Sequence, residues 1–250
     1  MFGNLPFPGA AGQGGDQLIS KAVKAAISAL LKQTDQLEVK VKAEPVAKLL
    51  QGSVDGFDFV SQGMVMHSGL KVESMELYVQ AVSIDFGAIF KGQVQLKQPT
   101  QATMRIALTE EDLTTSFNTP FLIEKLQKLS HQGKPLVFEK TDITINDDQE
   151  IRMQSTIRQE TIEKAIDVDI TAHLQVQDRR KIQFVDVSYG GDSRAVELGN
   201  VLTEHVNELL DLDQFALDGM QLRVDQLRLR NKQMTLYGMA HIDKFPQRNT

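Results

Sequence analysis

Apolar and polar residues alternate along several stretches of the chain, and this two-residue period predicts β-strands with one buried and one solvated face. Over residues 37–44 every odd position is apolar and every even position is charged, and Pro45 ends the run. The same alternation recurs in four further segments, which are 141–145, 151–157, 166–176 and 234–242. The first two of these flank Asn146-Asp147-Asp148 and therefore predict a hairpin.

The longest alternating stretch covers residues 94–108, whose even positions keep one phase throughout. A strand of this length would measure roughly 50 Å, with Pro99 at a bend or edge position. Elsewhere the phase slips, as after Val72, which is followed by Met75 and Leu77. Such slips are typical of β-bulges, and bulges bend a sheet. We therefore expect a strongly bent sheet rather than a flat sandwich.

Three segments carry apolar residues at helical spacing behind a residue suited to cap a helix. The first covers about 16–34, and the second runs over 109–129 with a break at 118–120. The third covers about 192–210. Strands and helices together predict an α+β fold in which a long, strongly curved antiparallel sheet is combined with amphipathic helices.

The organisation of the chain is predicted to be simple. Residues 1–15 are rich in Gly and Pro and are expected to be a disordered tail, as are residues 246–250, with a single α+β domain over 16–245. Residues 70–77 match 222–229 in residue type at nearly every position, including a phase slip after the Val. Two related units in one sheet would explain this match, but eight residues can also agree by chance, so both interpretations stay open.

Composition excludes several classes of protein. The chain has 250 residues and a formal net charge of −6, which gives no overall attraction to nucleic acid. It contains no Cys, which excludes disulfides and thiol chemistry. No apolar run approaches ~18 residues, and the first residues lack the features of a secretory signal peptide. We therefore expect a cytoplasmic protein without a spanning helix.

No residue pattern indicates catalysis, a metal or a cofactor. The five His residues are scattered, and none forms the helical pair that a zinc site uses. Gly191-Asp192-Ser193 is similar to the nucleophile block of one lipase family, but capping of the third helix explains it better. A Gly-x-Ser-x-Gly nucleophile elbow does not occur. We therefore predict a protein that is not an enzyme and has no metal and no cofactor.

The order of the elements resembles that of a known family. The step Leu49-Leu50-Gln51-Gly52 and the step Leu108-Thr109-Glu110-Glu111-Asp112-Leu113 are similar to the LmeA-like phospholipid-binding family of bacteria, over about residues 16–245. The resemblance implies a tubular lipid-binding-like fold with the sheet wrapped around a helix and an apolar cavity. It also implies phospholipid binding without catalytic residues. Since a signal peptide is not seen, the cyanobacterial type, touching the inner face of a membrane, fits best.

The inward phases of the long strands supply candidate binding residues, together with the first helix. The side chains expected to line a lipid cavity are Val94, Leu96, Met104, Ile106, Leu108, Val168, Ile170, Leu174 and Ile27. Apolar residues clustered at the ends of elements are hard to bury and could touch a membrane. The membrane-contact candidates are Phe86, Phe90, Phe121 and Leu122.

Three hypotheses about function follow. The leading one is a non-catalytic carrier or sensor of phospholipid or fatty-acyl ligands, for which the nine Met residues would supply adaptable apolar surface. The second is a structural or adaptor domain that docks a protein partner through its apolar face. A hydrolase is the weakest, because no nucleophile is found. The lipid species and the oligomeric state stay open.

Overall fold

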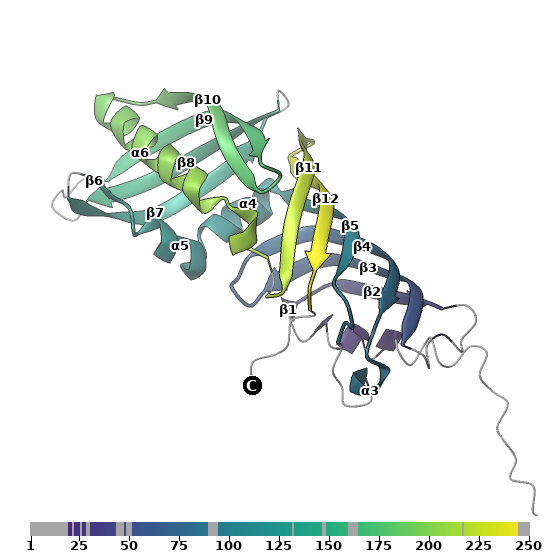
Figure 1. Ribbon diagram of the computed structural model, residues 1–250. Helices are drawn as coiled ribbons and strands as arrows, with labels where there is room; N and C mark the ends of the chain where they lie inside the picture. Colours follow the sequence, from purple (N-terminus) through teal and green to yellow (C-terminus); the bar gives the residue numbers. More distant parts are fainter. Residues whose placement is uncertain are drawn as a thin grey trace, which may run out of the picture.

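The computed structural model describes residues 20–21, 23–25, 27–28, 31–43, 48, 52–89, 95–131, 133–146, 149–159, 165–216 and 218–244. These residues form two antiparallel sheets that lie side by side along an elongated molecule (Figure 1). Helices are few beside the strands, so the predicted α+β class, built mainly on antiparallel sheet, is confirmed. The tails predicted at 1–15 and 246–250 lie outside the described residues.

One sheet has seven strands in the order β1-β3-β4-β5-β12-β11, and β2 pairs with β3 beside β1. The strands are β1 (Leu31–Gln33), β2 (Gln36–Lys42), β3 (Ser53–Met66), β4 (Lys71–Ser83), β5 (Thr100–Thr109), β11 (Met220–Arg230) and β12 (Gln233–Ile242). β2 shows why alternation predicts a strand. Its apolar residues are buried and the polar residues between them are exposed, because successive side chains of a strand point to opposite faces of the sheet.

The other sheet has five strands in the order β10-β9-β8-β7-β6. The strands are β6 (Ser130–His131), β7 (Lys134–Ile145), β8 (Glu150–Gln159), β9 (Ile166–Gln177) and β10 (Lys181–Gly190). β7 and β8 form the predicted hairpin, in which Ile143 lies opposite Met153. Each strand pairs with its neighbours along the chain, so the sheet is a meander.

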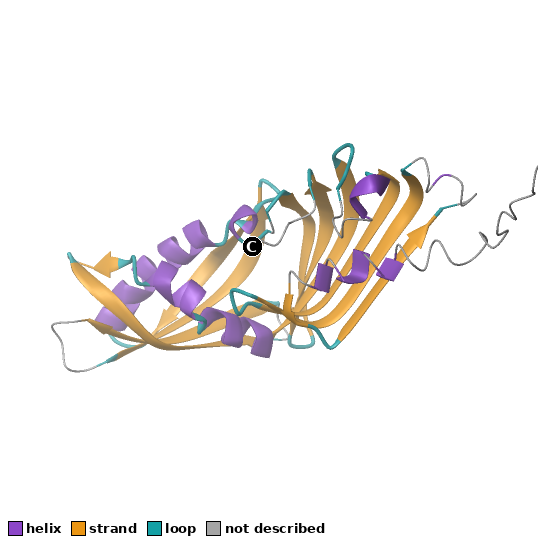
Figure 2. Ribbon diagram, turned by 90° about the horizontal axis from the view of Figure 1, so that it is seen from below, coloured by secondary structure: helices purple, strands orange, loops and turns teal. Residues whose placement is uncertain are grey.

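The helices are α3 (Phe86–Ile89), α4 (Glu110–Phe117), α5 (Pro120–Leu126), α6 (Ser193–Leu209) and the 3-10 helix η1 (Leu212–Gln214). α4, α5 and α6 lie where helices are predicted, whereas α3 and η1 were not predicted. Thr109 and Asp112 form a capping box at the start of α4, and Asp192 caps α6. Figure 2 shows α4, α5 and α6 along the five-stranded sheet. The described turns of the N-terminal helix, between residues 20 and 28, and α3 lie on the seven-stranded sheet.

The prediction of one long, strongly curved sheet is wrong. The strands form two separate sheets, and among the described strands the end strands of either sheet do not pair to close it. The reason lies in the connections. After β5 the chain leaves the first sheet through α4, builds the whole second sheet, and returns only with β11 and β12. The alternation of apolar and polar residues in a strand indicates which of its residues are buried, but it does not indicate which sheet the strand joins.

Two element boundaries also differ from prediction. The strand expected over 94–108 begins only at Thr100, directly after Pro99, and Leu96 makes only an isolated bridge with Ile84. The N-terminal helix, expected to reach about Thr34, ends earlier, because Leu31 already pairs with Met66 of β3. In both places the element boundary is set by pairing with a neighbouring strand. The local residue pattern carries no information about that pairing.

The phase slips seen in the sequence correspond to backbone irregularities. In β4 the slip between the buried residues Val79 and Val82 coincides with Ala81, whose φ is +54°. In β11 the register against β12 shifts between Val224 and Gln226. The β11 position is a bulge, so the interpretation of the slips as bulges is confirmed there. β4 keeps one register against β3 on both sides of Val72 and of Ala81, so its slips are not bulges in that pairing.

α4 covers the edge of β7 through side chains spaced four residues apart. The Thr141 N–H donates to Asn118 Oδ1 at 2.9 Å, and Asn118 Nδ2 donates to the Thr141 carbonyl at 2.6 Å. The Ile143 N–H donates to Thr114 Oγ1 at 2.9 Å, and Thr114 Oγ1 lies 3.2 Å from the Ile143 carbonyl oxygen. The Ile145 N–H donates to Glu110 Oε2 at 3.3 Å. The spacings match, because four helical residues rise about 6 Å and two strand residues about 6.6 Å. α4 thus replaces a missing neighbouring strand.

We expect Asn118→Ala to lower the free energy of unfolding by about 2 kcal/mol, because it leaves the N–H and C=O of Thr141 without partners. For a chain of this size the melting temperature should fall by roughly 4–8 °C. Thermal unfolding followed by circular dichroism measures the effect. Asn200→Ala is the matched control, since Asn200 is exposed and bonds only within α6 through Val196. Equal melting temperatures of the two variants would contradict the proposed role of Asn118.

Candidate functional site

The seven-stranded sheet carries one continuous apolar face, built from side chains that lie opposite one another on neighbouring strands. In one row Val39 lies opposite Phe59, then Leu77 and Met104. We define the apolar face by its buried residues, which are Val39, Val41, Phe57, Phe59, Leu77, Val79, Ala102, Met104, Ile106, Leu236 and Ala240. Cross-strand neighbours of this kind are about 5 Å apart, so they form a single apolar surface.

The N-terminal helix lies against this face. Val23 is buried and Ile27 is partly buried against the same core. The Ser20 hydroxyl accepts a hydrogen bond from the Val41 N–H of the edge strand β2 at 3.3 Å. The described turns of this helix cross the strands in Figure 2. The helix therefore forms a cover over the apolar face.

The structure divides the predicted lipid-lining residues between the two sheets. Met104 and Ile106 lie on the apolar face, while Leu96, Leu108 and Ile27 are partly buried against its core. The predicted lining residues on the other sheet are Val168, Ile170 and Leu174 of β9. Val94 lies outside the described residues.

The β9 residues face a core that α6 covers. Ile170 is fully buried, and so are Leu198, Leu202 and Val206 of α6. α6 follows the sheet along its length in Figure 2. The apolar surface of the five-stranded sheet is thus closed by a long helix.

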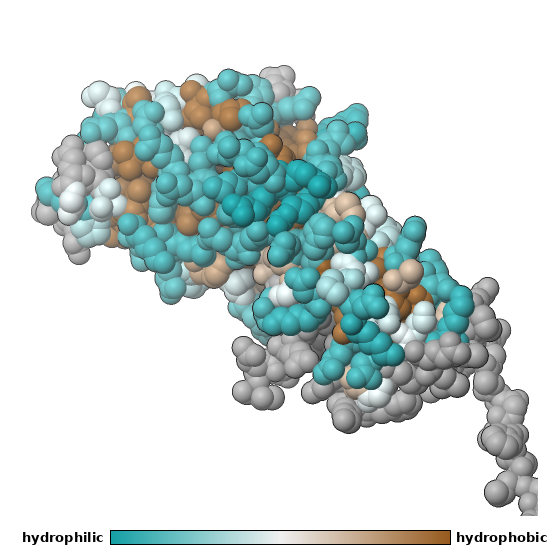
Figure 3. All heavy atoms as spheres, in the orientation of Figure 1, coloured by the Kyte–Doolittle hydropathy of each residue, from teal (hydrophilic) through white to brown (hydrophobic). Residues whose placement is uncertain are grey.

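The predicted membrane-contact residues have different environments. Phe121 is partly buried, with its ring edge-to-face against Phe215 at 6.3 Å and Lys125 Nζ 5.2 Å from its ring centre. Leu122 is 5% exposed and belongs to the interior. Phe90 and the side chain of Phe86 lie outside what the structure describes. The surface seen in Figure 3 is mostly hydrophilic, with hydrophobic residues in small patches.

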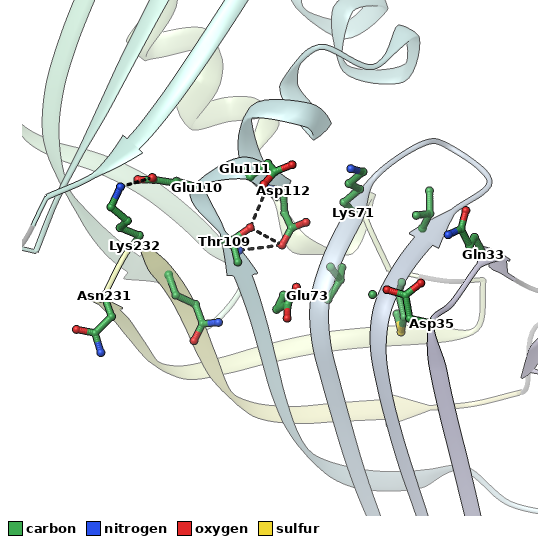
Figure 4. Close-up of a pocket in the computed structure, with 15 residues that line it drawn as sticks. Gln33, Asp35, Lys71, Glu73, Thr109, Glu110, Glu111, Asp112, Asn231 and Lys232 are labelled. Atoms are coloured by element: carbon green, nitrogen blue, oxygen red, sulfur yellow. Dashed lines mark hydrogen bonds and ion pairs between the residues drawn. The ribbon is translucent and has the colours of Figure 1, made fainter.

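A pocket of about 590 Å³ lies at one end of the seven-stranded sheet (Figure 4). Its lining comes from residues 33–35, 63–65, 71–73, 109–112 and 231–233. These segments are the ends of strands and the start of α4, so strand pairing brings together positions far apart in the chain. Its volume falls in the range of small-ligand sites, ~300–1,000 Å³. We refer to it as the rim pocket.

The rim pocket has an apolar floor and a charged wall. Met64 and Val72 line it and belong to the buried core. The charged residues that line it are Asp35, Glu73, Glu110, Glu111, Asp112, Lys71 and Lys232. Five acids and two lysines give the lining a net charge of −3. An apolar floor beside charged groups suits an amphipathic ligand.

Some of these charges already have partners within the protein. Lys232 Nζ lies 2.9 Å from Glu110 Oε1. This hydrogen bond and one from the Ile145 N–H lower the pKa of the Glu110 carboxyl below its ordinary value of 4.5. The Asp112 carboxylate accepts from the N–H and hydroxyl of Thr109 in the capping box. The start of α4 is therefore occupied by its own side chains.

Sequence reasoning did not find the rim pocket. It placed the acids at 110–112 within the helix expected over 109–129 and within the family step at 108–113, and it assigned no role to Asp35, Lys71 or Glu73. The only available signal was that these polar residues flank strand ends. Their convergence depends on the register between β3, β4 and β5.

None of the helices in the described part of the chain is long and apolar enough to cross a membrane. Within the same part of the chain, no three His, Asp or Glu side chains are grouped closely enough to hold a metal ion.

Comparison with known proteins gives one match. A family model described as LmeA-like phospholipid-binding matches residues 10–239 of the chain. No curated protein and no solved structure matches it. The match spans both sheets and the rim pocket.

The Glu110 contacts predict a pH dependence. A carboxyl whose pKa is lowered by folding stabilises the protein above its ordinary pKa, and this contribution is lost as the pH falls through the folded-state pKa. We expect Glu110→Gln to lower the free energy of unfolding by about 1 kcal/mol at pH 7, a value discounted for solvent screening. The difference should shrink towards zero at pH 3. Thermal melts at both pH values measure it, with the exposed neighbour Glu111→Gln as control. A difference that is the same at pH 3 and pH 7 would contradict the assignment.

Proposed function

The chain belongs to the LmeA-like phospholipid-binding family, and from this premise we propose that it binds a phospholipid, or another lipid with acyl chains, without catalysing a reaction. The observation that carries the proposal is the apolar face of the seven-stranded sheet with an amphipathic helix as its cover. Acyl chains need a dry apolar surface, and a helix that lies on a sheet can be displaced more easily than a strand that belongs to it.

We place the acyl chain between the N-terminal helix and the seven-stranded sheet. Met104 and Ile106 lie on the apolar face, and Leu96, Leu108 and Ile27 are only partly buried at its margins. Met side chains adapt to loosely shaped apolar ligands. The β9 residues Val168, Ile170 and Leu174 would form a second apolar layer only if α6 moved. In this proposal the sheet and its helix together enclose the lipid, as in the tubular lipid-binding arrangement.

Further features of the proposal concern the setting of the protein. We propose that residues 16–245 act as one domain, which the contacts between α4 and β7 support. We also propose a cytoplasmic protein of the cyanobacterial type that touches the inner face of a membrane, because a lipid carrier must reach its ligand there. Transfer or sensing of the lipid would follow from such contact.

One observation favours a second candidate function, an adaptor domain that docks a protein partner. Ala102 and Met104 in the centre of the apolar face are at most 2% exposed in the chain without ligand. A core that is already closed needs no lipid. The experiment on bound lipid separates the two candidates.

We expect the protein, purified without detergent, to carry about one lipid per chain. Native mass spectrometry of the purified protein, followed by organic extraction, measures the mass and the class of what is bound. A mass that corresponds to the bare chain, and that stays unchanged after incubation with liposomes, would exclude the carrier and leave the adaptor.

A pair of neighbouring variants tests membrane contact at α5. We expect Phe121→Ser to weaken co-flotation with liposomes about fivefold, because roughly 1 kcal/mol of apolar contact is lost, while the melting temperature changes little. Leu122→Ser should instead lower the melting temperature by roughly 6–12 °C, since Leu122 is buried. If Phe121→Ser leaves flotation unchanged, α5 is not the contact with the membrane.

A further inference from the structure

The rim pocket has no role in acyl-chain binding as such, yet it opens beside the surface that would hold the chain. We propose that it binds the zwitterionic headgroup of a phospholipid that carries a primary ammonium group, with the ammonium at Asp35 and Glu73 and the phosphate at Lys71. This inference rests on the proposed function and specifies its ligand class.

Continuity between the pocket and the apolar face supports the inference. Glu73 lines the pocket and lies on the same side of β4 as Leu77 and Val79, which follow four and six residues along the strand in unbroken register. Along β4 the six residue steps from Glu73 to Val79 span about 20 Å. One leaflet of a bilayer is about 15 Å of hydrocarbon, so an acyl chain that lies along β4 fits this length. A lipid with its chain on the apolar face would place its headgroup in the pocket.

Among the described residues, the side-chain charges of Asp35, Glu73, Lys71 and Glu111 form no ion pair, whereas Glu110 is bonded to Lys232 and Asp112 to Thr109. The three proposed contact groups are therefore not engaged by an opposite charge of the described chain. All three line the rim pocket, with Lys71 and Glu73 on β4 and Asp35 on the other side of β3 (Figure 4). A group with both signs of charge matches this arrangement, while a headgroup that is only anionic meets an excess of carboxylates.

The backbone makes room for the Asp35 carboxylate. Gly63 has a φ of +59°, and a Cβ built there would collide with the carboxylate of Asp35. Gly63 lies in β3 between Gln62 and Met64, which pair with Ser74 and Val72 of β4. Glu73 therefore occupies the neighbouring position on β4. Absence of a side chain at 63 thus lets the Asp35 carboxylate lie against β3 at the pocket.

A competition between two lipids tests the inference. The delipidated full-length protein is incubated with vesicles that contain equal amounts of phosphatidylethanolamine and phosphatidylglycerol with identical acyl chains, then re-isolated and extracted. We expect phosphatidylethanolamine to be enriched about fivefold, the size expected from two solvent-exposed charge contacts. Free glycerophosphoethanolamine, which has the headgroup without acyl chains, should not compete at equal concentration.

The variant Asp35→Asn/Glu73→Gln should retain lipid but reduce the enrichment to about one. The control Glu204→Gln/Glu208→Gln makes the same change of net charge on the exposed side of α6 and should keep the fivefold preference. Thermal melts of both variants establish that they are folded.

The outcomes separate the inference from the proposed function. Retention of lipid without preference, or with preference for phosphatidylglycerol, overturns the inference and leaves lipid binding in place. A preference that survives Asp35→Asn/Glu73→Gln, or equal competition by glycerophosphoethanolamine, also overturns it. If neither lipid is retained, the proposed function fails and the inference fails with it.

Discussion

A strand at the edge of a sheet presents N–H and C=O groups that must find partners, and in this protein helices supply them. Asn118 of α4 bonds both backbone groups of Thr141 on β7. At the opposite edge, Asn207 of α6 accepts from the Phe184 N–H at 2.7 Å and donates to the Phe184 carbonyl at 3.3 Å. Both edges of the five-stranded sheet are thus covered. Because α4 follows β5 without an intervening residue, its position on β7 also sets how the two sheets lie relative to each other.

A second contact between the two sheets is made at the β-bulge of β11. The register shift in β11 leaves the Val224 N–H available, and it donates to the carbonyl of Arg179, in the turn between β9 and β10, at 2.7 Å. The Arg179 side chain pairs with Asp225 at 2.7 Å. Each side chain of this ion pair is about half exposed, so the backbone bond carries more weight than the charges. The two sheets are therefore held together by hydrogen bonds to strand edges rather than by a shared sheet.

The apolar faces of the two sheets are covered in different ways. The five-stranded sheet is closed by α6, whose Leu202 and Val206 are buried on it. The seven-stranded sheet has a cover that comes from the start of the chain and a charged pocket at one end. In our proposal the lipid displaces the helix on the seven-stranded sheet, while α6 stays in place on the other sheet. Membership of a phospholipid-binding family agrees with this proposal.

The sequence by itself determined the buried face of several strands and the starts of some of the elements. Two-residue alternation predicted β2, the β7–β8 hairpin, β9 and β12, and capping residues predicted the starts of α4 and α6, because both signals act between near neighbours in the chain. Only the tertiary structure decided that there are two sheets, that Met104 and Ile170 belong to different ones, and that Asp35, Lys71 and Glu73 meet. Those outcomes depend on which strand edges pair, and pairing is set by contacts between residues far apart in sequence, which local pattern does not record.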